Sequence, residues 1–116
     1  MRSITSHGSP HTVFRRALAR GDLIAVRAAA ADLPAVPLDD ALQILVLILE
    51  QEPQRFERAA LRWLTRLLAE RPIAELRQAE LAVHHLAALP DRRRGRTALE
   101  LLTALVSARP GGPPRR

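Results

Sequence analysis

The chain has 116 residues, and alanine (20), leucine (20) and arginine (18), all of them strong helix formers, make up half of it. That length suits one domain with a modest core. The absence of cysteine excludes a disulfide framework and thiolate chemistry, and a content of only three aromatic residues argues against a β-sandwich or a barrel.

The formal net charge of +6 is concentrated outside the predicted helical body. Residues 11–108 contain 14 arginines and 12 acidic residues. Four of these arginines form a cluster that we call the arginine loop: Arg92, Arg93, Arg94 and Arg96. Lysine is absent, and a composition so rich in arginine and alanine is also typical of a GC-rich genome. The excess charge therefore lies in the two ends of the chain and in this loop.

We predict a single all-α domain over residues 10–109, with a flexible segment at 1–9 and a flexible Pro/Gly/Arg tail at 110–116. The N-terminal residues lack the apolar region of a secretory signal. No apolar run approaches the roughly 20 residues that a membrane helix needs. We therefore expect a cytoplasmic protein without a membrane partner.

Capping residues, proline stops and apolar periodicity predict six helices along the chain. Ser9 suits the N-cap of the first helix, and Pro10 suits its first position. Gly21 fits the left-handed position after that helix, and Asp22 can cap the second. The predicted helices cover, approximately, residues 10–20, 23–33, 38–51, 54–71, 73–89 and 96–108.

The stretch 38–51 is predicted to be the central helix. Every residue from Ile44 to Leu49 is aliphatic, and a helix that is apolar all round belongs inside a packed assembly. Asp39 and Asp40 place negative charge at the positive end of its dipole. We expect the other helices to cover its faces.

An internal repeat supports a hairpin architecture. The segment RAALRWLTRLLAERP (58–72) matches RTALELLTALVSARP (96–110) at eight of 15 positions, at an offset of 38 residues. A two-helix period of this length resembles the tetratricopeptide, HEAT and armadillo repeat families. The resemblance implies three antiparallel hairpins of about 38 residues, arranged as a short α-solenoid or as a compact helical bundle.

The helix predicted at 54–71 has two distinct faces. Four arginines fall within an arc of about 80° on a helical wheel, and we call them the arginine stripe: Arg55, Arg58, Arg62 and Arg66. The opposite, apolar side is predicted to carry Phe56, Ala60, Leu61, Leu64, Leu67 and Leu68. Trp63, at the edge of that side, is interpreted as a core residue. Guanidinium groups in such a row suit carboxylates or phosphates, although a solvated face is the plainer interpretation.

No sequence motif indicates catalysis, a cofactor or a metal. The chain lacks G-x-G-x-x-G, a Walker loop, G-x-S-x-G and H-E-x-x-H. Glu80 and His84 lie one helical turn apart, but two ligands do not make a zinc site. We therefore expect a protein that is not an enzyme.

These observations predict a non-catalytic protein–protein interaction module, an adaptor or an assembly subunit, that binds an acidic partner surface. The arginine stripe and the arginine loop are its candidate binding residues. One alternative is a nucleic-acid-binding protein that contacts phosphates through the same arginines and the tail residues Arg115 and Arg116, with steep salt dependence. The other is a structural homo-oligomer without a small-molecule ligand, for which an exposed aliphatic patch beside the central helix would be expected.

Overall fold

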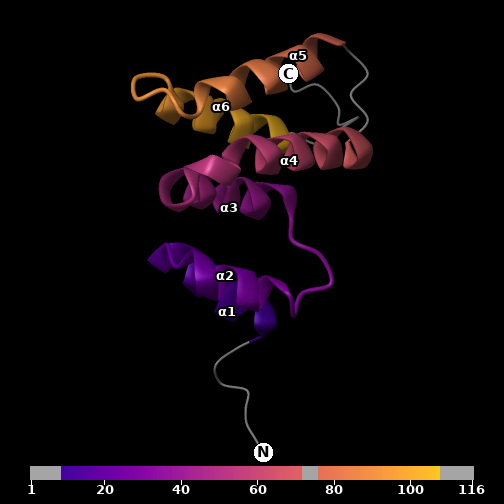
Figure 1. Cartoon of the computed structure of the whole chain (residues 1–116). Coiled ribbons are helices and arrows are strands. Elements are labelled where there is room, and N and C mark those ends of the chain that lie inside the picture. Colours follow the sequence, from indigo (N-terminus) through magenta and orange to yellow (C-terminus); the bar gives the residue numbers. More distant parts are fainter. Residues whose placement is uncertain (1–8, 72–75, 108–116) are drawn as a thin grey trace, which may run out of the picture.

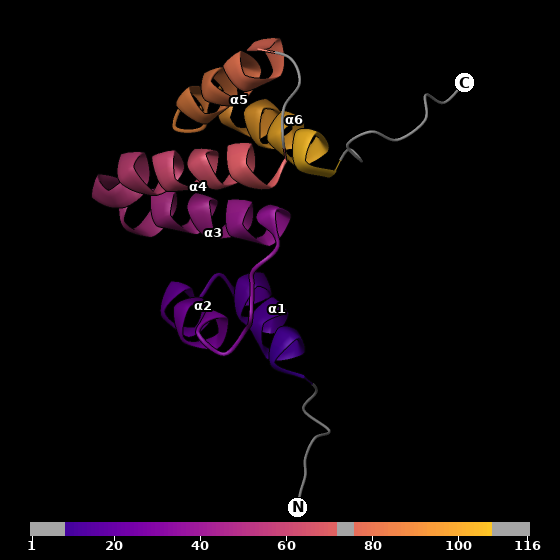
Figure 2. The same cartoon turned by 90° about the vertical axis from the view of Figure 1, so that its right-hand side faces the viewer.

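Three helical hairpins stack in chain order. The computed structural model describes residues 9–71 and 76–107, and within them it contains six α-helices and no strand. The helices pair as α1 (Pro10–Arg20) with α2 (Leu23–Ala30), α3 (Leu38–Gln51) with α4 (Phe56–Glu70), and α5 (Leu76–Ala88) with α6 (Gly95–Ser107). Figures 1 and 2 show the three pairs as successive layers, with the N-terminal hairpin at one end. The predicted all-α class and the three hairpins are confirmed.

The first hairpin is closed by the predicted capping residues. The backbone N–H of Thr12 donates to Ser9 Oγ at 3.2 Å, and that of Ala25 donates to Asp22 Oδ1 at 3.0 Å. Gly21 between the helices has a φ of 71°, a left-handed conformation that glycine adopts without steric cost. The turn is tight because each helix end has its own cap.

Two predicted boundaries were wrong. Helix α2 ends at Ala30 instead of Leu33, because Pro34 disfavours a helical conformation at the residue before it. Helix α4 begins at Phe56 instead of Gln54, after a 3₁₀ turn over Pro53–Arg55. The predicted start of the fifth helix at residue 73 lies outside the described residues.

Helix α3 joins two hydrophobic clusters. The larger cluster spans α3 to α6, also contains Leu23 of α2, and includes the fully buried Leu42, Leu67 and Leu102. The smaller one is built around Phe14 and Val26 within the first hairpin. Partly buried side chains of α3, among them those of Ile44 and Leu47, pack against both. The central position predicted for this helix is confirmed. No helix in the described part of the chain combines the length and hydropathy that crossing a bilayer requires.

Trp63 lies in the core, as predicted. The buried face of α4, however, is narrower than the arc of apolar residues that its sequence predicts. The Trp63 side chain is 5% exposed, and its Nε1 donates to the carbonyl oxygen of Leu38 at 3.1 Å. Leu61 and Leu68, predicted on the apolar side, are 59% and 43% exposed. The prediction was wrong for these two because α4 turns its Phe56–Trp63–Leu67 side to the core. Both leucines lie roughly 100° or more from that side at 100° per residue.

Candidate partner-binding surface

The structure divides the arginine stripe into paired and unpaired members. Arg66 is held in place, since its guanidinium donates to the carbonyl oxygen of Val36 and pairs with Glu70. Arg55 lies 3.8 Å from a carboxylate oxygen of Glu52. Arg58 and Arg62 are exposed and form no hydrogen bond or ion pair within residues 9–71 and 76–107.

The unpaired arginines line a concave surface beside α4. A cleft of about 690 Å³, which we call the α4 cleft, is lined by Arg27 of α2, Ile48 of α3 and seven residues of the segment 54–62. A second hollow, of about 450 Å³, continues along α4 and shares Arg58, Leu61 and Arg62 with the first. Both hollows are open to solvent, and Arg58 and Arg62 line both of them.

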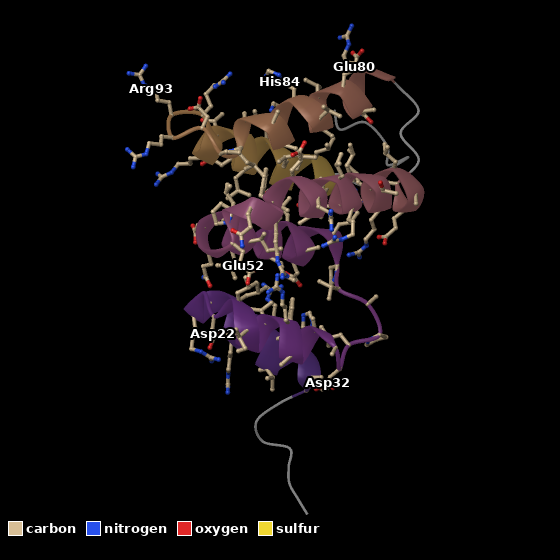
Figure 3. The ribbon with its side chains drawn as sticks, in the orientation of Figure 1. Asp22, Asp32, Glu52, Glu80, His84 and Arg93 are labelled. Atoms are coloured by element: carbon tan, nitrogen blue, oxygen red, sulfur yellow. The ribbon has the colours of Figure 1, made fainter. Side chains whose placement is uncertain are left out.

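Glu52 pairs with arginines at the end of the α4 cleft next to the first hairpin. Its two carboxylate oxygens accept from Arg27 Nη2 and Nη1 at 2.9 and 3.0 Å, and Figure 3 shows Glu52 between α3 and the first hairpin. This bidentate hydrogen bonding holds the pKa of Glu52 below its ordinary value and raises that of Arg27. The positive charge left without an acidic partner in the cleft is therefore that of Arg58 and Arg62.

The Arg27–Glu52 pair predicts a specific pH dependence of stability. Because the pKa of Glu52 is lowered in the folded protein, its contribution is present above the ordinary value of about 4.3 and is lost as pH falls through the lowered one. Glu52→Gln is therefore expected to reduce the fall in the urea midpoint between about pH 6 and about pH 3. Glu57→Gln, in the same cleft but outside the pair, should retain the fall of the wild type. Equal falls in all three proteins would contradict the prediction.

The arginine loop belongs to the last hairpin, and some of its residues stabilise the turn between α5 and α6. The Asp91 carboxylate accepts from the backbone N–H groups of Arg94 and Arg93, which lowers the pKa of Asp91, and it also pairs with the Arg94 guanidinium at 3.3 Å. A side chain at Gly95 would lie 2.6 Å from the carbonyl oxygen of Leu89, so the loop requires glycine there. Arg92, Arg93 and Arg96 are exposed, and Figure 3 shows Arg93 pointing away from the stack.

The structure does not bring the two arginine clusters together into one band. The arginine stripe lines hollows on the side of α4 that reaches Arg27 and Val36 in the first part of the chain. The last hairpin packs elsewhere on the middle one, through contacts of α5 with α4 and of α6 with α3. The predicted site residues therefore form two surfaces, of which only the stripe lines the α4 cleft.

Asp40 has a role that sequence reasoning missed. It was interpreted as a helix-dipole residue, but its side chain is buried and accepts from Arg15 Nη1 at 2.9 Å. Its Oδ2 has no hydrogen-bond partner among the residues that the structure describes. A partner 25 residues away leaves no trace in the local pattern, so only the fold could reveal this link between α1 and α3.

The histidines of α5 do not assemble a metal site. Glu80 and His84 are both exposed at the outer edge of α5 (Figure 3). The His84 and His85 rings lie edge to face, with centroids 5.4 Å apart. Burial, and secondarily the charge of His84, lower the pKa of His85. The residues that the structure describes contain no group of three histidine, aspartate or glutamate side chains placed to hold a metal ion.

Comparisons with known proteins add no family or relative to these observations. No protein-family model, no curated protein and no solved structure matches the chain.

Proposed function

We propose that the protein is a non-catalytic protein–protein interaction module that binds an acidic partner surface along α4. The observation that carries the proposal is the pair Arg58 and Arg62. Both side chains lack a partner among the described residues, and both line the α4 cleft and the hollow that continues it.

The surroundings of this pair support binding of carboxylates. The planar guanidinium group donates two parallel hydrogen bonds to a carboxylate, as Arg27 at the same cleft does to Glu52. Two unpaired cations on one exposed surface also attract an acidic surface before contact. An acidic partner would provide carboxylates for Arg58 and Arg62, as Glu52 does for Arg27.

The described surface supports a protein partner better than nucleic acid or self-association. A nucleic-acid backbone needs positive charge along its path, but the positions equivalent to Arg62 in α2 and α6 are the exposed residues Ile24 and Glu100. Self-association was expected to use an aliphatic patch beside the central helix. The large exposed apolar residues are instead distributed over α1, α2, α4, α5 and α6.

Charge reversal tests the proposal. Purified protein used as bait should retain a stoichiometric protein from native lysate after nuclease treatment. The variant Arg58→Glu/Arg62→Glu should reduce its recovery at least about tenfold, which corresponds to roughly 1.4 kcal/mol. The matched control Arg92→Glu/Arg93→Glu makes the same charge change outside the cleft and should leave recovery unchanged.

Other results would contradict the proposal in different ways. Recovery that disappears with nuclease and falls steeply with salt would indicate nucleic acid. Equal loss in the two variants would indicate that net charge, not the α4 cleft, determines binding. Turnover of a substrate, or a cofactor that copurifies with the protein, would overturn the non-catalytic assignment.

A further inference from the structure

An exposed leucine lies beside the two unpaired arginines of the α4 cleft. Leu61 lines both hollows together with Arg58 and Arg62. The α4 cleft also reaches the apolar side chains of Ile48 and Ala59. The surface therefore presents an apolar contact beside two positive charges, and a ligand that satisfies it must combine an apolar group with two anionic groups.

The spacing of the charges limits the shape of that ligand. Arg58 and Arg62 are four residues apart on one helix, which separates them by about 6 Å along its axis. Two carboxylates placed one turn apart on a partner helix have the same separation. An apolar residue three or four positions from either carboxylate would lie on the same face and reach Leu61.

An extended peptide has similar spacing but fits this protein less well. Alternate residues of a strand are about 6.7 Å apart and share a face. A bound strand, however, gains its affinity by pairing its backbone with the edge of a sheet. The described part of the chain contains no sheet, so such a strand would bring unpaired N–H and C=O groups to the cleft. A helix satisfies its own backbone and has no such cost.

We propose that the occupant of the α4 cleft is an amphipathic helix of a partner protein that carries two carboxylates one turn apart and an aliphatic residue on the same face. The inference rests on the proposed function and specifies its partner. The two carboxylates pair with Arg58 and Arg62, and the aliphatic side chain packs on Leu61. Arg27 and Arg55 already have Glu52 as an acidic partner, so Arg58 and Arg62 are the two arginines of the cleft that lack one.

The aliphatic residue of the proposed partner helix distinguishes it from a phosphate backbone. Leu61 is 59% exposed beside the two arginines, and a phosphodiester strand offers no aliphatic group to cover it. Glu57 also lines the cleft and would repel a continuous anionic strand. A helix can avoid this repulsion because its acidic groups occupy only two positions.

Selection from a display library of helical peptides tests the inference without a known partner. The full chain serves as target, and the Arg58→Glu/Arg62→Glu variant removes peptides that bind elsewhere. Enriched peptides should carry two acidic residues three or four positions apart with an aliphatic residue on the same face. In a binding titration, moving one acid by two residues, at constant composition, should weaken an enriched peptide about tenfold or more. Leu61→Ala should weaken binding several-fold, whereas Leu68→Ala, also exposed on α4 but outside both hollows, should leave it unchanged.

Each remaining outcome overturns the inference. No enrichment over the counter-selected variant, or enrichment of peptides that bind equally well after the acid is moved, would exclude a helix with this spacing. A labelled DNA duplex that binds more tightly than the peptides and is lost in the same variant would assign the cleft to nucleic acid. A protein retained from lysate in an Arg58- and Arg62-dependent way, together with a failed peptide selection, would leave the proposed function standing and remove only the helical partner.

Discussion

Replacement of Trp63 by alanine is expected to lower the free energy of unfolding by about 3–5 kcal/mol, the range for removal of a buried large side chain. The indole is 5% exposed and belongs to the cluster that holds α3, α4, α5 and α6 together. Its loss leaves a cavity and also removes the donor that pairs with the Leu38 carbonyl oxygen. Small domains have about 5–15 kcal/mol in total, so this variant should be close to unfolding. Urea denaturation followed by circular dichroism measures the change.

Leu61→Ala is the matched control on the same helix. Leu61 is 59% exposed, and its replacement should change the free energy of unfolding by no more than about 0.5 kcal/mol. A large loss at Leu61 with a small loss at Trp63 would mean that α4 turns a different face to the core. The pair therefore tests the orientation of the helix that carries the arginine stripe.

The hairpins could be predicted because their signals are local. Ser9, Gly21 and Asp22 act at the ends of α1 and α2 as their residue types require. The rotation of α4 was not predictable to the same degree, because its apolar arc is wider than the face that α3 and the last hairpin cover. The choice between Trp63 and Leu61 depends on those neighbouring helices, which the pattern of α4 alone does not contain.

The candidate site shows the same division between local and distant information. A period of 100° per residue predicted that the four arginines of the stripe share a face of one helix, and Arg58, Arg62 and Arg66 do so on α4, whereas Arg55 lies in the 3₁₀ turn before it. The sequence could not distinguish Arg66 from Arg58 and Arg62, because the carbonyl that holds Arg66 belongs to Val36, 30 residues away. The α4 cleft was likewise not predictable, since it arises where Arg27 of α2 approaches α4 across Glu52.

Removal of Arg15 is expected to destabilise the protein through the carboxylate that it leaves behind. Asp40 is 4% exposed, and one of its oxygens already lacks a hydrogen-bond partner within residues 9–71 and 76–107. Arg15→Leu should therefore lower the free energy of unfolding by about 1–3 kcal/mol, the cost of an unsatisfied buried group. The cost should stay below the roughly 3–5 kcal/mol of a fully buried pair. The Arg15 side chain is 56% exposed, so solvent already screens the interaction.

The double variant Arg15→Leu/Asp40→Leu should recover most of this loss, because it removes the buried charge together with its partner. Urea denaturation of both single variants and the double variant at pH 7 gives the coupling energy directly. A double variant less stable than Arg15→Leu would mean that Asp40 acts through another group.

Arg15 and Asp40 join α1 to the start of α3, whereas Glu52 lies at the other end of that helix. Neither Arg15 nor Asp40 lines the α4 cleft. The double variant should therefore retain binding of the acidic partner while Arg58→Glu/Arg62→Glu loses it, which separates attachment of the first hairpin from recognition at α4.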